Sequence, residues 1–88
     1  MARFYFHFLD GSRLICDKEG AEFASADRAR EEALSSAREL LSSAVRSGED
    51  VGADALVVID DRGNEIALMP VSEALPRRLR CPLNASRR

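Results

Sequence analysis

A run of helix-spaced apolar residues in the middle of the chain constrains the fold more than any other feature. These mostly small side chains recur at about 100° per residue and form one narrow stripe, at Ala26, Ala29, Ala33, Ala37, Leu40 and Ala44. Ser25 is suited to cap the start of this helix, and Gly48 is suited to the left-handed position just past its end. The pattern predicts a helix of about 21 residues, roughly 31 Å long. Its alanine stripe predicts close approach to a neighbouring layer.

Strand patterns precede the helix. Residues 3–9 alternate with a period of two, which places Phe4, Phe6 and Phe8 on one face. The dipeptide Asp10-Gly11 favours a tight turn, so residues 13–16 are expected to return as a second strand. The three phenylalanines are expected to face the core and to fill the space that the small residues of the helix leave.

A second hairpin is predicted after the helix. The β-branched apolar run over residues 55–59 and the segment 65–71 are separated by a turn that contains Gly63. Pro70 cannot donate a ladder hydrogen bond, so the last strand is expected to lie at a sheet edge or to end there. Residues 72–75 are expected to add one short turn.

The order of these elements predicts an α+β fold, β-β-α-β-β, in which a four-stranded, mainly antiparallel sheet carries one long helix on one face. Residues 1–76 form the predicted domain, and residues 77–88 form an arginine-rich tail. A single helix covers one face of such a sheet and leaves the other open. The alternate strand positions expected on that open face are mostly apolar: Tyr5, Leu9, Ile15, Leu56, Val58, Ala67 and Met69.

Length and composition exclude several classes of protein. The chain has 88 residues, enough for one small domain. None of its apolar runs approaches the roughly 20 residues that span a bilayer, and its start lacks the long apolar segment of a signal peptide. We therefore expect a cytoplasmic protein without membrane contact. In that reducing compartment Cys16 and Cys81 are expected to be free thiols, Cys16 as a small apolar residue in a strand and Cys81 exposed in the tail.

Charge is divided unevenly along the chain. The net charge of the whole chain is −2, but residues 1–76 contain 8 basic and 15 acidic residues, a net charge of −7, while residues 77–88 contain five arginines and no acid. An acidic body repels phosphate, so nucleic-acid binding would depend on the tail. This hypothesis assigns the contact to Arg77, Arg78, Arg80, Arg87 and Arg88. The same arginines are equally suited to contact the acidic body or an acidic protein partner.

Four short motifs stand out along the chain: the opening Arg3-Phe4-Tyr5-Phe6-His7 with Asp10-Gly11, the turn Asp17-x-x-Gly20, the alanine-rich helix, and the hairpin turn Asp60-Asp61-Arg62-Gly63. Together they resemble a family of small bacterial proteins that is grouped only as a domain of unknown function. The resemblance covers about residues 3–75 and leaves out the tail. It implies no activity and no catalytic residue.

Catalytic and metal-binding patterns are weak. His7 is the only histidine, and its nearest candidate co-ligands are Cys16, Asp10 and Asp17, without the spacing of a tetrahedral metal site. The serines lie in no nucleophile elbow, and the glycines form no phosphate-binding loop. The adjacent carboxylates Glu31-Glu32 and Asp60-Asp61 diverge rather than converge on a substrate. We therefore expect no enzyme, no metal and no cofactor, and a structural histidine on the sheet surface.

The most favoured function is that of an interaction or regulatory module that forms a homodimer through its open sheet face, although a different protein partner stays open. The residues assigned to this interface are Tyr5, His7, Leu56, Val58 and Met69. An apolar sheet face on a small domain is typically covered by a partner.

Overall fold

The computed structural model describes residues 1–80 and confirms the α+β class, with the helix between two hairpins. The strands are β1 (Ala2–Asp10), β2 (Arg13–Ile15), β3 (Ala21–Phe23), β4 (Ala55–Asp60) and β5 (Glu65–Pro70), and α1 (Ala26–Ser47) follows β3. A short 3₁₀ helix, η1 (Val71–Ala74), follows β5 at the position of the predicted turn. None of the helices within residues 1–80 is long and apolar enough to cross a membrane.

The sheet is antiparallel at every pairing, with the order β2-β1-β4-β5. The short strand β3 was not predicted. It pairs with the start of β1, while β2 pairs with the end of β1. Both short strands lie along the same edge of β1, since β4 occupies the opposite edge at Phe4 and at Phe8. Strand β5 lies at the opposite edge of the sheet, as predicted from the position of Pro70.

The helix has the predicted ends. The Ser25 hydroxyl accepts a hydrogen bond from the backbone N–H of Arg28 at 3.2 Å, and Gly48 adopts the left-handed conformation with φ of 76°. The backbone N–H of Gly48 donates to the carbonyl of Ala44 at 2.8 Å and so completes the last turn.

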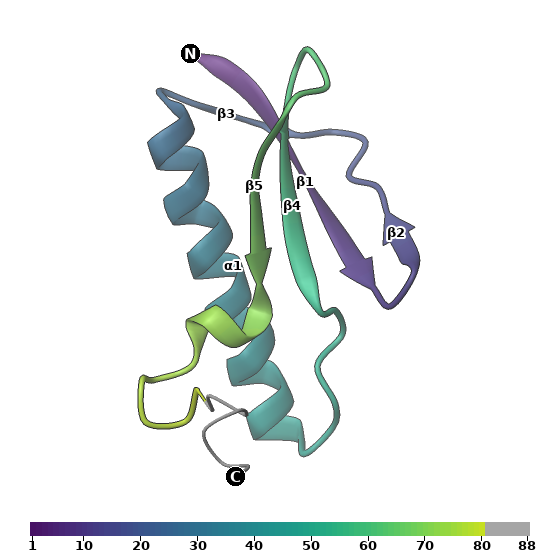
Figure 1. Cartoon of the computed structure of the whole chain (residues 1–88), viewed down its shortest axis with the longest axis vertical. Coiled ribbons are helices and arrows are strands. Elements are labelled where there is room, and N and C mark those ends of the chain that lie inside the picture. Colours follow the sequence, from purple (N-terminus) through teal and green to yellow (C-terminus); the bar gives the residue numbers. More distant parts are fainter. Residues whose placement is uncertain (81–88) are drawn as a thin grey trace, which may run out of the picture.

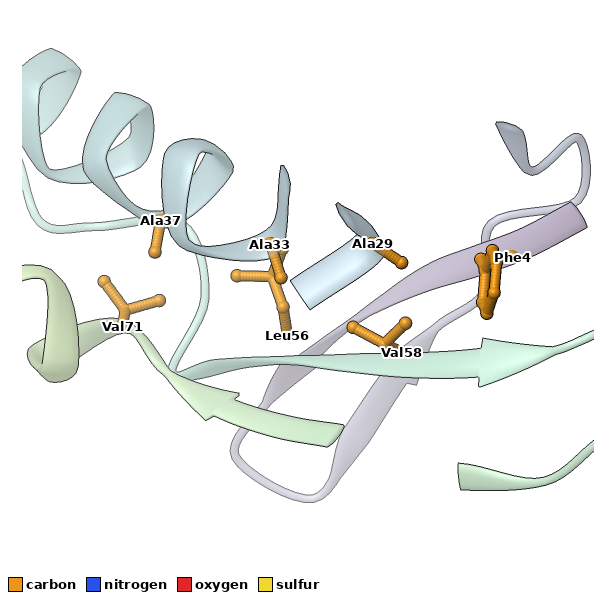
Figure 2. Close-up of a cluster of buried hydrophobic side chains, with 7 residues drawn as sticks. All are labelled: Phe4, Ala29, Ala33, Ala37, Leu56, Val58 and Val71. Carbon is orange, nitrogen blue, oxygen red and sulfur yellow. The ribbon is translucent and has the colours of Figure 1, made fainter. Parts of the chain in front are cut away.

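The core lies between α1 and the sheet (Figure 2). It consists of Phe4, Ala29, Ala33, Ala37, Leu56, Val58 and Val71, with Phe6, Phe8 and Phe23 packed against it. The three central alanines are fully buried, and their small side chains allow the helix to approach β4 closely. Phe4, Phe6 and Phe8 therefore face the core as predicted.

The helix does not cover its side of the sheet evenly. It contacts β3, β4, β5 and η1, while β2 lies on the far side of β1 from the helix (Figure 1). Ile15 in β2 pairs with Phe8 and so shares the helix-facing side, yet it remains 40% exposed. The helix-facing side is therefore open beside β2.

Candidate interaction surface

The pairing register identifies the sheet face that points away from α1. Directly paired residues of an antiparallel sheet lie on the same face. Phe6 pairs with Val58 on the core side, so the neighbouring pair, His7 and Val57, lies on the other side, and Val57 pairs in turn with Leu68. The same reasoning places Tyr5 with Ile59, and Leu9 with both Leu14 and Ala55, on this open face.

Five aliphatic side chains from four strands make up what we call the open-face patch. Leu68 is 53% exposed and Leu14 is 48% exposed, at the two edges of the sheet. Leu9, Val57 and Ile59 are half-buried between them. The open-face patch thus crosses the whole width of the sheet, from β2 to β5.

This register corrects the predicted interface. Leu56 and Val58 are fully buried against α1, and Met69 packs on the same core. The placement of these three residues on the open face was wrong, because they pair with one another and with the phenylalanines of β1. Ile15 and Ala67 share this helix-facing side for the same reason. Tyr5 and His7 do lie on the open face, where they are half-buried.

Residues 16–20, which we call the β2–β3 loop, cause this partial burial. Phe8 of β1 pairs with Ile15 in β2, and Phe4 of β1 pairs with Ala21 in β3. The segment between Ile15 and Ala21 is two residues longer than the segment of β1 between Phe4 and Phe8. The extra residues form a loop at the sheet edge, and the backbone of β1 between the two short strands has no strand partner there. Asp17 compensates for this gap: its Oδ2 accepts a hydrogen bond from the backbone N–H of Phe6 at 3.1 Å.

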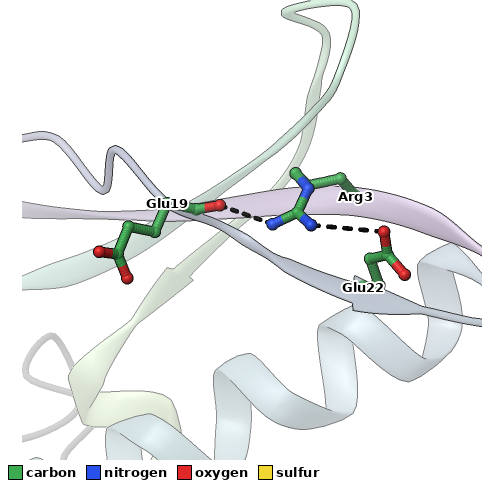
Figure 3. Close-up of polar contacts among 3 residues, drawn as sticks. All are labelled: Arg3, Glu19 and Glu22. Atoms are coloured by element: carbon green, nitrogen blue, oxygen red, sulfur yellow. Dashed lines mark hydrogen bonds and ion pairs between the residues drawn. The ribbon is translucent and has the colours of Figure 1, made fainter.

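The open-face side chains of β1 hold the same loop. Arg3 donates to the carbonyl of Glu19 at 2.7 Å and pairs with the Glu22 carboxylate at 3.3 Å (Figure 3). His7 Nδ1 accepts a hydrogen bond from the backbone N–H of Asp17 at 3.0 Å. The ring of Tyr5 lies so close to Gly20 that a Cβ there would be only 2.8 Å from it.

Asp17 remains ionised in this setting. Partial burial by itself raises the pKa of its carboxyl, but the backbone N–H groups of Gly20, Phe6 and Glu19 stabilise the charged form, and His7 adds a smaller electrostatic contribution. The net result is a pKa below the ordinary value of 3.8. The Asp17 carboxylate and His7 Nδ1 therefore both accept hydrogen bonds from backbone N–H groups and tie the β2–β3 loop to β1.

The other candidate ligands near His7 do not join it. Cys16 is an exposed free thiol that follows the end of β2, so its predicted place inside a strand was wrong. Within residues 1–80, no group of three histidine, cysteine or acidic side chains is arranged to hold a metal ion.

The arginine-rich segment is described only in part. Arg77, Arg78 and Arg80 are exposed, and Arg80 lies 3.7 Å from the Glu73 carboxylate. Cys81, Arg87 and Arg88 lie outside the described residues. Nucleic-acid binding through these arginines therefore stays a prediction.

Comparison with known proteins places this architecture in a family. The family model described as Domain of unknown function (DUF6894) matches residues 3–72, which include the helix and all of the sheet except Ala2, so the chain belongs to this family. The match ends before Arg77, in agreement with the predicted limit of the shared pattern. No curated protein and no solved structure matches the chain.

Proposed function

We propose that this member of the family is a cytoplasmic, non-enzymatic interaction module, and that two copies associate through the open-face patch. The observation that carries the proposal is the contrast between the two sides of the sheet. Helix α1 buries Leu56 and Val58 completely on one side, whereas Leu14 and Leu68 are about half exposed on the other. An apolar surface that spans four strands favours contact with a second protein surface.

The aliphatic composition of the open-face patch is suited to a symmetric dimer. In such a dimer both copies present the same surface, so that surface must be complementary to itself. The five side chains of the patch are aliphatic and therefore meet this condition without matching of charges, and Glu65, which pairs with Ile59, borders them on the same face. The one charged side chain of β1 on this face, Arg3, is already neutralised by Glu22. Each side chain transferred from water into the contact contributes about 25 cal/mol per Å² of buried apolar area.

The test is the mass in solution of Leu68→Asp, measured by light scattering on a sizing column over a dilution series. Leu68 is exposed on an edge strand, so the aspartate remains hydrated in the monomer and the fold is retained. In a dimer the same aspartate would be desolvated without a partner. We expect the wild type to have twice the mass of the chain and Leu68→Asp to have the mass of the monomer.

Two further variants serve as controls. Val45→Asp removes an apolar side chain that is 82% exposed on α1, outside the patch, and should leave the dimer intact. Val58→Asp introduces a charge into the core and should unfold the chain, as circular dichroism would report. A wild type that is monomeric at every concentration, or a dimer that Val45→Asp disrupts as strongly as Leu68→Asp, contradicts the proposal.

A further inference from the structure

A pocket of about 340 Å³ lies where the helix leaves its side of the sheet uncovered. Its walls come from β1, β2, the β2–β3 loop, β3 and the middle of α1. The floor is formed by three half-buried phenylalanines, Phe6, Phe8 and Phe23. The volume falls within the range of roughly 300–1,000 Å³ that is typical of small-molecule sites.

The charged groups that line this pocket have one sign. Among residues 1–80, Asp17 and Glu32 are the only charged residues that line it, and they approach it from the loop and from the helix. Asp17 is held in the ionised form by three backbone N–H donors. Within residues 1–80 no ion pair involves Glu32, whereas its neighbour Glu31 pairs with Arg28 at 3.4 Å. A positive group entering the pocket would therefore meet carboxylates, with no cationic side chain among the described lining residues.

We propose that this pocket binds an organic cation carried on an apolar body, such as an arylalkyl amine. The apolar body lies against the phenylalanine rings, and the cation lies between Asp17 and Glu32. Aromatic rings add to the selectivity, because the negative face of a ring attracts a cation. An anion of the same shape is disfavoured by both carboxylates and by the ring faces.

This site is separate from the proposed dimer contact. Phe6 and Phe8 point to the helix side of the sheet, and the open-face patch lies on the opposite side. The inference therefore goes beyond the proposed function, and each can fail without the other. Repeating the binding experiment in the Leu68→Asp variant keeps the two results distinguishable.

Cys16 supplies a direct reporter, because its exposed thiol lines the pocket. The experiment uses the full chain with Cys81→Ser, so that Cys16 is the single thiol, and follows its alkylation by neutral iodoacetamide. Phenethylammonium and hydrocinnamate are the probes, since they have the same aromatic body and opposite charges. We expect phenethylammonium to slow the alkylation of Cys16 in a saturable manner and hydrocinnamate to leave the rate unchanged.

A reference thiol separates binding from general effects on the reagent. In a chain with Cys16→Ser, Cys81→Ser and Ser43→Cys, the thiol lies on an exposed helix position that does not line the pocket. Phenethylammonium should not protect it. Equal protection at both positions, equal protection by the two probes, or no protection of Cys16 by either probe overturns the proposal.

Two helix variants test the assigned residues. Glu32→Gln, at an exposed position, should raise the phenethylammonium concentration for half-protection about fivefold, the effect of one unit charge at about 4 Å in water. Ser36 lines the pocket, so Ser36→Leu should fill it and abolish protection, while Ser43→Leu in the Cys81→Ser chain should not. Circular dichroism confirms the fold of each variant. Protection unchanged in both Glu32→Gln and Ser36→Leu would place the probe elsewhere.

Discussion

At the scale of single residues, the first strand shows how an alternating sequence serves two surfaces at once. Phe4, Phe6 and Phe8 pack towards the helix. The residues that alternate with them contact the β2–β3 loop by different means: Arg3 by a hydrogen bond to the Glu19 carbonyl, Tyr5 by packing on Gly20, and His7 by accepting a backbone hydrogen bond. Arg3, Tyr5 and His7 are thus the residues of β1 that attach the loop to the sheet.

The closest packing in this arrangement predicts a large effect for Gly20→Ala. Gly20 has φ of 69°, and an added Cβ would lie 2.8 Å from the carbonyl oxygen of Phe4 and 2.8 Å from the Tyr5 ring. Gly63 has φ of 88° with open space around it, so Gly63→Ala has only the backbone strain of about 1–2 kcal/mol. We expect Gly20→Ala to be less stable than Gly63→Ala by about a further 1–3 kcal/mol. Urea denaturation measures both, and equal losses would mean that the loop moves away freely.

Asp17→Asn should lower stability in a pH-dependent manner. The asparagine oxygen still accepts from Glu19 and Gly20, but its amide group cannot accept from the N–H of Phe6, which costs about 1–3 kcal/mol. Because the pKa of Asp17 is lowered in the folded chain, its stabilisation is present above the ordinary pKa of 3.8 and is lost as pH falls through the folded-state pKa.

The stability difference between wild type and Asp17→Asn should therefore be largest near neutral pH and should narrow below pH 3.8. Asp60 remains in both chains and gives them a shared pH dependence, since hydrogen bonds led by the backbone N–H of Asn64 also lower its pKa. Urea denaturation at a series of pH values tests this. A gap of constant size would show that the charge of Asp17 contributes nothing.

At the scale of elements, the helix was predictable and the faces of the second hairpin were not. Ser25, the alanine stripe and Gly48 are local signals, and each has the expected conformation. The run over residues 55–59 is apolar at every position, so its sequence does not indicate which side faces the helix. Both sides are in fact apolar, with Leu56 and Val58 in the core and Val57 and Ile59 on the open face.

Strand β3 escaped prediction for a different reason. It has three residues and exists because it pairs with β1, whereas its own sequence, Ala21-Glu22-Phe23, contains no alternating pattern long enough to detect. The pocket on the helix side depends on this strand and on the displaced loop. Both follow from pairing between distant segments, which the local sequence does not specify.

The contact between α1 and β4 predicts that Ala33→Leu destabilises the chain. Ala33 is fully buried in the core with Leu56 and Val58, so a larger side chain must displace the helix or distort its neighbours. Such overpacking typically costs about 1–3 kcal/mol. Ser35→Leu adds the same side chain on the exposed face of α1 and should have little effect on folding stability. Thermal unfolding of the two variants tests this. Similar melting temperatures would show that α1 and the sheet move apart to accommodate the leucine without loss of stability.

At the scale of the whole molecule, charge is divided along the sequence, whereas the apolar open-face patch lies on one face of the sheet. All 15 acidic residues lie within residues 1–76, and the five arginines of the arginine-rich segment follow them in the chain. The open-face patch lies within the sheet and involves none of these arginines. Self-association and any electrostatic contact of the arginine-rich segment should therefore respond differently to salt.

This separation predicts the behaviour of a chain truncated after Arg80. The truncation keeps every described element and the Arg80–Glu73 contact. Because the proposed dimer is held by aliphatic side chains, the truncated chain should show the same mass at each dilution as the full chain. Raising the salt concentration should not dissociate the dimer of either chain, since screening weakens charge contacts but not apolar burial.

A contact through the arginines would behave in the opposite way. Both self-association through them and binding of a single-stranded oligonucleotide would be weakened by salt and by the truncation. Light scattering and oligonucleotide titration at low and high salt decide between them. A mass that falls to the monomer on truncation would move the interface from the sheet to the arginine-rich segment.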